Sequence, residues 1–482
     1  MEFSEYQKKI FEVYDNTRKN IVVNAAPGSG KSFTLNELVK RTPEYKSILV
    51  MAFNKSIQKE LRDKLPEHVD VYTYHGMGFR VLSQHTNKNY CVNDSKSFKI
   101  FYPILAKKLK EKKAKKLIPT IIEYSNIYRM SCCNSIKELK KVLDEREVFY
   151  SETELKILKD CLNKLEQYNT ESHDKFMIDF IDMLEMPLKL LKEKDFPKYQ
   201  IIMLDESQDQ NNLQKTFWEK FLKKGSRFVA VGDFRQAIYG FMGADSSVFE
   251  SLKSKPNTIE LPLSVSYRCP KKIVEKASLY FDGVEAHEDN IEGEVRCGDL
   301  DEVQNGDFVI CRNNLPLFKA FIYLLTQGRK VHILGKDLQD NIRRLTEDFI
   351  LNGGRERRSQ ELLFAKIENL KNKGVTKQKK HPSYRALKEL IDITMLLLNH
   401  FGTESNLQTE LDFIFNNDDN EGVTLMTGHK SKGLEANRVF WLMPQLIPSE
   451  YVRTERDLEQ EKSLAFVIIT RAKEELIMVK EI

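Results

Sequence analysis

The chain has 482 residues, of which 41% are apolar and 30% are charged. At roughly 150 residues per domain, this length predicts about three domains, and the composition is that of an ordinary globular protein. The 76 Lys and Arg residues slightly exceed the 71 Asp and Glu residues, which gives a net charge of +5. This small excess excludes a histone-like, strongly basic binder but is compatible with local basic tracks along a phosphate backbone.

No apolar run of about 18 residues occurs, and the N-terminal MEFSEYQKKI has no apolar core segment. We therefore expect neither a transmembrane helix nor a secretory signal, and no membrane partner. The seven cysteines form no CxxC pair and are odd in number. We interpret them as reduced thiols without zinc in a cytoplasmic or nuclear protein that is not secreted.

Short apolar runs followed by helical patterns recur in two separated blocks of the chain. They lie at 21–24, 47–53, 199–204 and 227–231, and again at 307–311, 423–426, 438–442 and 475–479. Because buried parallel strands read as continuous apolar runs, this alternation predicts an α/β protein with two parallel sheets.

Two segments between these runs are predicted to be helical insertions. The first contains a tract at 106–117 with seven lysines around one acid, Glu111, which is either a solvated helix face or a face that contacts phosphates. The second carries basic clusters at 343–344, 355–358 and 371–380. The expected domains are a first α/β domain at 1–84 and 198–261 with a helical insertion at 85–197, and a second at 262–336 and 422–482 with a reduced insertion at 337–421.

The first apolar run leads directly into a glycine-containing loop, and an amphipathic segment follows. Strand, loop and helix in this order are the context of a phosphate-binding loop. Its backbone N–H groups would close around a polyphosphate, Lys31 would contact the β- and γ-phosphates, and Ser32 would bind Mg²⁺. The expected nucleotide contacts are Ala25, Ala26, Pro27, Gly28, Ser29, Gly30, Lys31 and Ser32. Ala25 stands where the GxxxxGK[ST] pattern has its first glycine.

The apolar run at 201–204 ends in adjacent carboxylates. Asp205 follows the strand directly, where it can hold Mg²⁺, and Glu206 can accept a proton from an attacking water molecule. Together with Lys31 and Ser32, these carboxylates predict a site that hydrolyses ATP with Mg²⁺.

Further segments give a more specific pattern in chain order. They are DESQD at 205–209, VGDFRQAIYGFMGA at 231–244, LSVSYR at 263–268, TLMTGHKSKGLE at 424–435 and EKSLAFVIITRAK at 461–473. With the loop at 25–32, they resemble the motifs of the UvrD/Rep/PcrA-like branch of superfamily 1 DNA helicases, and FNKS at 53–56 is most similar to the eukaryotic F-box DNA helicases. The resemblance covers both α/β blocks but not the insertions. It implies two RecA-like motor domains with ATP and Mg²⁺ between them.

The resemblance also implies roles for single residues at the phosphates. Gln236 would contact the γ-phosphate and report its presence. Arg268 and Arg471 resemble the arginine fingers of the family, which reach the γ-phosphate from across the cleft. Glu435 resembles a residue that reaches the sugar and phosphates of the nucleotide.

Three residues are implied at the base. Gln7 stands where the family has a glutamine that reads adenine, and Tyr267 resembles the aromatic residue that stacks on it. Phe33 replaces an arginine that often packs on adenine in the family. An aromatic ring can stack in the same place, so the departure leaves base selectivity open.

Single-stranded nucleic acid is held by stacked aromatic side chains and by contacts to phosphates. The candidates for these contacts are Phe53, Asn54, His75, Tyr239, Phe241, Thr427 and His429. For the aromatic residues and His75, a role in the core is the alternative. The Trp-Arg pair of the family's third motif is Phe241-Met242 here, which keeps an aromatic ring but not the contacts of the arginine.

These patterns predict an ATP-dependent DNA helicase or translocase that binds single-stranded DNA and junctions of single- and double-stranded DNA. The resemblance implies 3′–5′ movement. Because the second insertion is smaller than in the large bacterial members, a translocase that displaces bound proteins with little unwinding is an alternative. An RNA motor and a nucleotide-gated binding module are further alternatives. The compact chain would suit a phage or viral protein, and its protein partners are not predicted.

Overall fold

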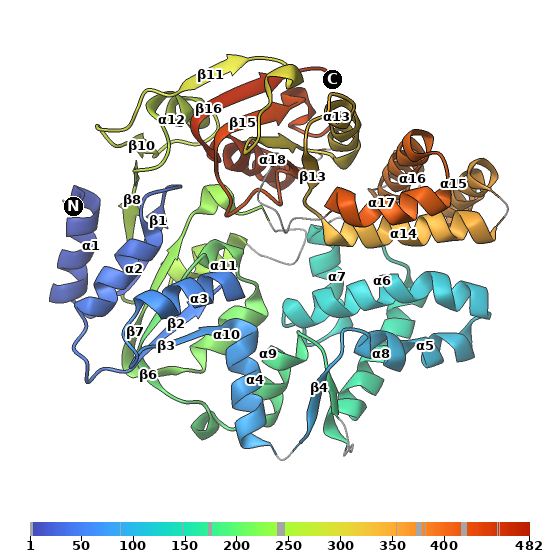
Figure 1. Cartoon of the computed structure of the whole chain (residues 1–482). Helices are drawn as coiled ribbons and strands as arrows, with labels where there is room; N and C mark the ends of the chain where they lie inside the picture. Colours follow the sequence, from blue (N-terminus) through green and yellow to red (C-terminus); the bar gives the residue numbers. More distant parts are fainter. Residues whose placement is uncertain are drawn as a thin grey trace. The chain divides into compact units, whose positions relative to one another are not determined.

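The computed structural model describes residues 3–86, 88–146, 148–171, 176–238, 246–352, 354–372, 378–380, 382–415, 422–450, 452 and 454–482. The chain divides into two compact units. The first comprises Met1–Ala25 and Gly30–Leu263, and the second comprises Ala26–Ser29 and Ser264–Ile482. Figure 1 shows the elements of both units in their sequence colours.

The first unit is built on a six-stranded parallel sheet in the order β3-β2-β6-β7-β1-β8. The strands are β1 (Asn20–Ala25), β2 (Ile48–Ala52), β3 (Asp70–Thr73), β6 (Tyr199–Leu204), β7 (Leu222–Gly232) and β8 (Thr258–Leu263). The predicted strands β1, β2, β6 and β7 occupy its centre. The two edge strands were not predicted, because β3 alternates buried and half-buried residues and β8 contains Glu260 and Pro262.

Helices cover both faces of this sheet (Figure 1). One face packs against α1 (Glu5–Asn16), α2 (Lys31–Lys40) and α3 (Lys55–Lys64). The other packs against α4 (Tyr74–His85), α10 (Asn212–Glu219) and α11 (Ser246–Lys253). Ile21 and Val23 face the first set of helices and Val22 faces the second, and all three are fully buried. Burial on both faces is the reason why the central strands lack a polar alternation.

The first insertion is a helical body with a hydrophobic core of its own. It contains α5 (Lys96–Lys108), α6 (Glu111–Met130), α7 (Ile136–Glu145) and α8 (Glu152–Thr170). A short parallel pair, β4 (Tyr90–Val92) with β5 (Phe176–Ile178), and helix α9 (Asp182–Leu190) connect it to the sheet. The lysine tract lies where α5 ends and α6 begins.

The second unit has another six-stranded parallel sheet, in the order β11-β16-β15-β12-β14-β13. Its strands are β11 (Glu294–Cys297), β12 (Phe308–Cys311), β13 (Val331–Ile333), β14 (Val423–Thr427), β15 (Ala436–Leu442) and β16 (Ala472–Val479). Helices α12 (Lys271–Ser278), α13 (Asn314–Thr326) and α18 (Glu455–Ile469) accompany the strands. The predicted strands are again present and the short edge strands β11 and β13 are additional, so the α/β class with two parallel sheets is confirmed.

The second insertion differs from the first in its packing. Its helices are α14 (Lys336–Leu351), α15 (Arg355–Asn372), α16 (Pro382–Phe401) and α17 (Glu404–Phe415). Residues such as Phe349 and Leu411 belong to the same hydrophobic cluster as Val331 and Val423 of the sheet. This insertion therefore extends the core of its sheet. In the part of the chain that the structure describes, no helix is both long and apolar enough to cross a membrane.

Candidate functional site

The predicted phosphate-binding loop joins β1 to α2. Gly28 and Gly30 have φ values of +68° and +82°, in the left-handed region that glycine adopts without strain. Gly30 is the N-cap of α2 and gives no side-chain hydrogen bond to the helix, so the first N–H groups of α2 are not capped by it. The Ser29 hydroxyl is buried and has no hydrogen-bond partner among the described residues. Both features suit an anionic ligand at this helix terminus.

Lys31 and Glu206 lie together in the first unit. The Lys31 Nζ donates to Glu206 Oε1 at 2.6 Å. Burial alone would lower the pKa of Lys31, but the charges of Glu206, Asp205 and Asp233 raise it above its usual value, so the lysine stays cationic. Glu206 has a φ of +46°, and this strained conformation at the end of β6 directs its carboxylate to the lysine.

Asp205 fits a cation site. It is 3% exposed, and its Oδ1 has no hydrogen-bond partner among the described residues. Burial, followed by the charge of Glu206, raises the pKa of Asp205 to about 7. A buried carboxylate with an unused oxygen is a ligand that Mg²⁺ prefers. Ser32, the other predicted magnesium ligand, is half-buried in the first turn of α2.

Gln236 follows β7, the neighbour of both β1 and β6 in the sheet. Its Nε2 donates to Asp233 Oδ2 at 2.7 Å, and Asp233 also accepts from Arg235 Nε at 2.7 Å. The backbone N–H of Asp233 donates to Gln208 Oε1, and Gln208 Nε2 donates to Glu206 Oε2 at 2.7 Å. Gln236 is thus connected to Glu206 at the carboxyl edge of the sheet through hydrogen bonds that include the backbone N–H of Asp233.

Gln7 and Phe33 both lie close to Gly30. A methyl group on Gly30 would lie 3.6 Å from Gln7 Nε2 and 3.7 Å from Phe33 Cβ. Gln7 Oε1 accepts from the backbone N–H of Ser4 at 3.0 Å, which fixes the orientation of the amide. The Phe33 ring is 38% exposed, and its centroid lies 6.0 Å from that of Phe3. Phe3, four residues before Gln7, was not among the predicted site residues.

Arg268 and Glu435 come together in the second unit. Arg268 Nη1 donates to Glu435 Oε2 at 2.9 Å, and Nη2 donates to the Thr470 carbonyl at 3.1 Å. The Arg268 Nε is buried without a hydrogen-bond partner among the described residues. Arg471, next to Thr470, is buried and donates to the carbonyls of Val467 and Leu434. The Tyr267 ring is 37% exposed.

Most of the nucleic-acid candidates lie in described parts of the chain, but Tyr239 and Phe241 lie outside the described residues. Phe53 is half-buried after β2, and the exposed Asn54 accepts the Ile57 N–H as N-cap of α3, which is a structural role. Thr427 is the last residue of β14, His429 lies two residues after it, and both are half-buried. Burial, with the charge of Arg312, lowers the pKa of His429 to about 4, so this imidazole is neutral at pH 7.

His75 contacts an aromatic residue that the sequence did not reveal. Its ring lies edge-on to Phe180, with centroids 5.6 Å apart, and Phe180 is 52% exposed. Phe180 lies in a turn closed by two reciprocal hydrogen bonds of 2.8 Å, from the Asp179 N–H to the Asp182 carboxylate and from the Asp182 N–H to Asp179. The signal was the sequence DFID at 179–182, in which two capping acids flank an aromatic residue.

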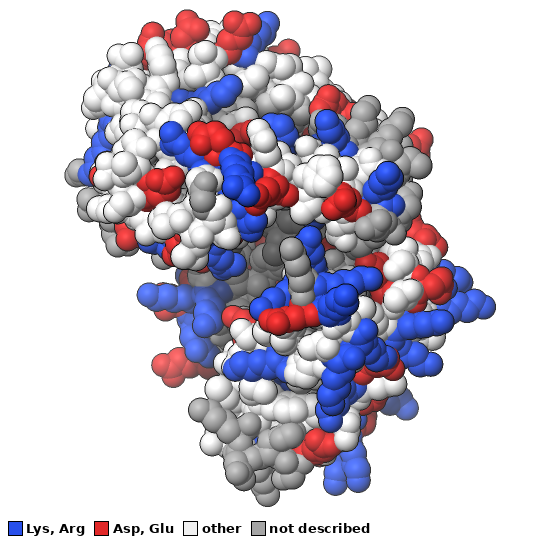
Figure 2. Space-filling view, turned by 90° about the vertical axis from the view of Figure 1, so that its right-hand side faces the viewer, with Lys and Arg blue, Asp and Glu red and all other residues white. Residues whose placement is uncertain are grey.

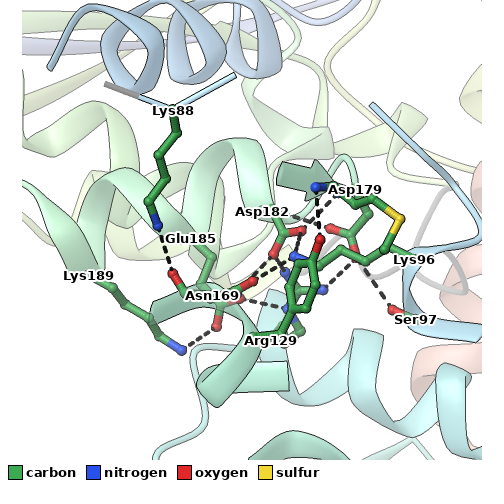
Figure 3. Close-up of polar contacts among 11 residues, drawn as sticks. Lys88, Lys96, Ser97, Arg129, Asn169, Asp179, Asp182, Glu185 and Lys189 are labelled. Atoms are coloured by element: carbon green, nitrogen blue, oxygen red, sulfur yellow. Dashed lines mark hydrogen bonds and ion pairs between the residues drawn. The ribbon is translucent and has the colours of Figure 1, made fainter. Parts of the chain in front are cut away.

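A buried cluster of charges holds this turn (Figure 3). Arg129, at the end of α6, donates to Asp179, Asp182 and Glu185 at 2.5–2.8 Å. Lys96, at the start of α5, donates to Asp182 at 2.6 Å and is fully buried. Burial alone would raise the pKa of Asp179, but the neighbouring guanidinium lowers it below its usual value. The first insertion is thereby anchored to the turn that carries Phe180.

Comparisons with known proteins show which family this chain resembles. The UvrD/REP helicase N-terminal domain matches residues 5–257, and the UvrD-like helicase C-terminal domain matches residues 322–481. A probable DNA helicase II homolog of Mycoplasma pneumoniae is 27% identical over 54% of this chain and 39% of its own length. F-box DNA helicase protein 1 of Schizosaccharomyces pombe is 25% identical over 98% of this chain and 57% of its own length.

The ATP-dependent DNA helicase Rep of Buchnera aphidicola subsp. Acyrthosiphon pisum is 24% identical over 59% of this chain and 46% of its own length. The chain spans about half the length of the curated relatives it matches. Because the N-terminal domain of the family alone matches more than half of the residues, in the part that carries Lys31 and Glu206, the chain belongs to the UvrD/REP helicase family.

Proposed function

We propose that this chain is an ATP-dependent motor that moves on single-stranded DNA and unwinds duplex DNA. The observation that carries the proposal is the ion pair between Lys31 and Glu206 beside the buried, unpartnered oxygen of Asp205. A phosphate-binding lysine, a general base and a metal-binding carboxylate are the groups that hydrolysis of a nucleoside triphosphate requires. The printed names of the relatives, DNA helicase II homolog, Rep and F-box DNA helicase, support DNA as the substrate.

In the proposed reaction, Lys31 and the N-terminus of α2 bind and orient the phosphates. Glu206 accepts the proton of the water that attacks the γ-phosphorus. Ser32 and Asp205 would hold Mg²⁺, which neutralises charge on the β- and γ-phosphate oxygens. Gln236 is connected to Glu206 through Asp233 and Gln208. A contact of Gln236 with the γ-phosphate would therefore affect the position of Glu206, the proposed general base.

The second unit would supply the residues that respond to the γ-phosphate. We propose that Arg268 and Arg471 stabilise charge on the transferred phosphoryl group and that Glu435 contacts the nucleotide sugar. The Arg268 guanidinium is oriented by Glu435 and by the Thr470 carbonyl, which supports a fixed position for it. Tyr267 and Phe33 would stack on the base, and Gln7 would read its edge with the amide held by Ser4.

On the DNA side, we propose that His75 and Phe180 offer stacking surfaces and that Thr427 and His429 contact sugar or phosphate. A neutral imidazole, which burial favours in His75, suits stacking better than ion pairing. Movement in the 3′–5′ direction is proposed from the family resemblance. Hydrolysis would change the affinity of each unit for the single-stranded DNA in turn.

Binding to junctions is proposed to use the lysine tract of the first insertion. Figure 2 shows Lys and Arg side chains gathered over this insertion. Lys108 and Lys115 pair with Asp160 and Glu111, whereas Lys107, Lys110, Lys113 and Lys116 are exposed with no ion-pair partner among the described residues. Four unpaired cations within ten residues favour the phosphate-contacting face over the merely solvated one.

The decisive experiment is ATP-dependent unwinding of duplexes with a 3′ or a 5′ single-stranded tail. We expect unwinding of the 3′-tailed duplex, stimulation of ATP turnover by DNA, and loss of both in Lys31→Ala. Full turnover in Lys31→Ala would refute the site. Displacement of streptavidin from a single strand without opening of a fork would favour the protein-displacing translocase, and equal stimulation by RNA would favour an RNA motor.

A further inference from the structure

Tyr267 has an aromatic neighbour for which the proposed chemistry gives no role. The ring of His287 lies 4.8 Å from the ring of Tyr267, centroid to centroid, and the two planes are inclined by 33°. The two rings form a tilted aromatic pair at contact distance. Tyr267 as a whole residue is nevertheless 37% exposed. One part of the tyrosine is therefore covered by an imidazole, and another part is open to a ligand.

The backbone places His287 beside Tyr267. Strand β9 (Val265–Ser266) pairs in parallel with β10 (Glu285–Ala286), so the residues that follow the two strands are neighbours. The His287 N–H donates to the Ser266 carbonyl at 3.0 Å. Asn290 Nδ2 donates at 2.8 Å to the carbonyls of both Ser266 and Cys269. The turn that begins at His287 is thus hydrogen-bonded to the backbone both before Tyr267, at Ser266, and after it, at Cys269.

The imidazole itself is also oriented. Its Nδ1 accepts the Asp289 N–H at 3.3 Å, and since a backbone N–H can only donate, Nδ1 carries the lone pair. Ring position and ring orientation are therefore both set by the turn, independently of any bound molecule.

We infer that His287 is a positioning residue that holds the Tyr267 ring in the orientation in which it stacks on the base of the nucleotide. This inference rests on the proposed function, since it gives His287 a role through Tyr267. A partly exposed tyrosine loses rotamer freedom when it stacks on a base, and a ring fixed beforehand loses less. His287 would thus improve binding of the base without taking part in hydrolysis.

The test compares His287→Ala with His287→Phe in the full chain. We expect His287→Ala to raise the KM for ATP about two- to twelve-fold, the range expected for loss of one aromatic pair, with kcat within about two-fold of the parent. His287→Phe should restore the KM, because it supplies a ring without the nitrogen atoms. Inhibition by inorganic tripolyphosphate, which has no base, should be unchanged in both variants.

A double-mutant cycle separates positioning from a general effect on the fold. In the Tyr267→Ala background, His287→Ala should have no further effect on KM, since there is no ring left to position. The matched control is His400→Ala, because His400 also packs on a neighbouring ring, that of Phe401, at 4.8 Å, but on α16. It should leave the KM unchanged.

Two results would overturn the inference. One is an equal effect of His287→Ala with and without Tyr267, and the other is an unchanged KM in His287→Ala. The Lys31→Ala variant distinguishes these from failure of the proposed function. If Lys31→Ala abolishes turnover while His287→Ala is silent, the positioning role is wrong and the site is right. If Lys31→Ala retains turnover, the proposed function itself is wrong.

Discussion

The ammonium group of Lys31 and the carboxylate of Glu206 form an ion pair of 2.6 Å between the N-terminus of α2 and the end of β6. The pair joins the lysine proposed to bind the γ-phosphate with the glutamate proposed to accept a proton from water. Since one carboxylate oxygen already accepts a hydrogen bond from the lysine, a triphosphate competes with Glu206 for the same cation. If both residues have the proposed roles, binding of the triphosphate would release Glu206 from the lysine and so be coupled to its action as general base.

Glu206→Gln should separate these two effects. We expect turnover to fall about 10²- to 10⁴-fold because the general base is lost. ATP binding should become tighter, since the neutral amide competes less well for Lys31. Turnover by phosphate release and equilibrium binding of a fluorescent ATP analogue measure the two effects. Glu37→Gln, on α2 and paired with Lys40, is the matched control and should change neither. Normal turnover in Glu206→Gln would exclude this base.

Arg268→Ala should reduce DNA-stimulated turnover by about 10³- to 10⁵-fold, the range for loss of an arginine finger. Arg268→Lys should rescue little, since a lysine lacks the forked geometry that bonds both Glu435 and the Thr470 carbonyl. Steady-state ATPase assays with saturating single-stranded DNA give the comparison. Arg296→Ala removes an arginine that pairs with Glu302 and Glu475 and should leave turnover unchanged. A less than ten-fold loss in Arg268→Ala would argue against the finger.

Phe180→Ala should weaken single-stranded DNA binding about 5- to 150-fold, because one stacked base is worth roughly 1–3 kcal/mol. Phe180→Trp should bind at least as well as the parent, since it keeps a ring in the turn. Fluorescence anisotropy with a labelled oligonucleotide measures the affinities. Phe364→Ala removes another exposed phenylalanine, on α15, and serves as control. If both variants bind DNA equally, Phe180 is not a contact.

Replacing Lys107, Lys110, Lys113 and Lys116 by glutamine should weaken binding to a tailed duplex more than binding to a single strand. The slope of log affinity against log salt concentration is negative. If all four lysines contact phosphates, this slope should become less negative by about 3 to 4 in the fourfold variant. A variant in which Lys108 and Lys115 are replaced controls for charge, since both are already paired. An unchanged slope in the fourfold variant would leave the solvated helix face as the correct reading.

The pKa of His429 predicts a contribution to stability that is lost in acid. In the unfolded chain the imidazole has a pKa near 6.5, whereas burial and the charge of Arg312 lower the pKa of the folded group to about 4. Between these values the unfolded chain takes up a proton that the folded protein does not. The free energy of unfolding should therefore fall, by about 2 kcal/mol at pH 5 from this residue.

His429→Gln should remove this component, so its stability should decrease less than that of the parent between pH 7.5 and pH 5. Urea denaturation at both pH values gives the difference. His68→Gln, at an exposed histidine, should behave like the parent. A parallel loss of stability in His429→Gln would show that this imidazole does not titrate as expected.

The sequence predicted the parts of this protein in which one local pattern has one structural solution. The strands at the centre of each sheet are buried on both faces, so they read as apolar runs, and the loop from Ala25 to Ser32 has a spacing that few structures use. The edge strands β3 and β8 escaped prediction because partial exposure permits polar residues and a proline. The motifs predicted Lys31, Glu206, Arg268 and Glu435 as site residues. They did not predict that Lys31 pairs with Glu206 and that Arg268 pairs with Glu435.

Those pairings come from tertiary structure, because they join residues far apart in the chain. Lys31 pairs with Glu206 because β1 and β6, with only β7 between them, end at the same edge of a parallel sheet. Phe180 meets His75, and His287 meets Tyr267, through turns whose hydrogen bonds leave no periodic trace in the sequence. Residue type and spacing thus determined which chemistry this protein carries, and the packing of distant segments decided which side chains act on one another.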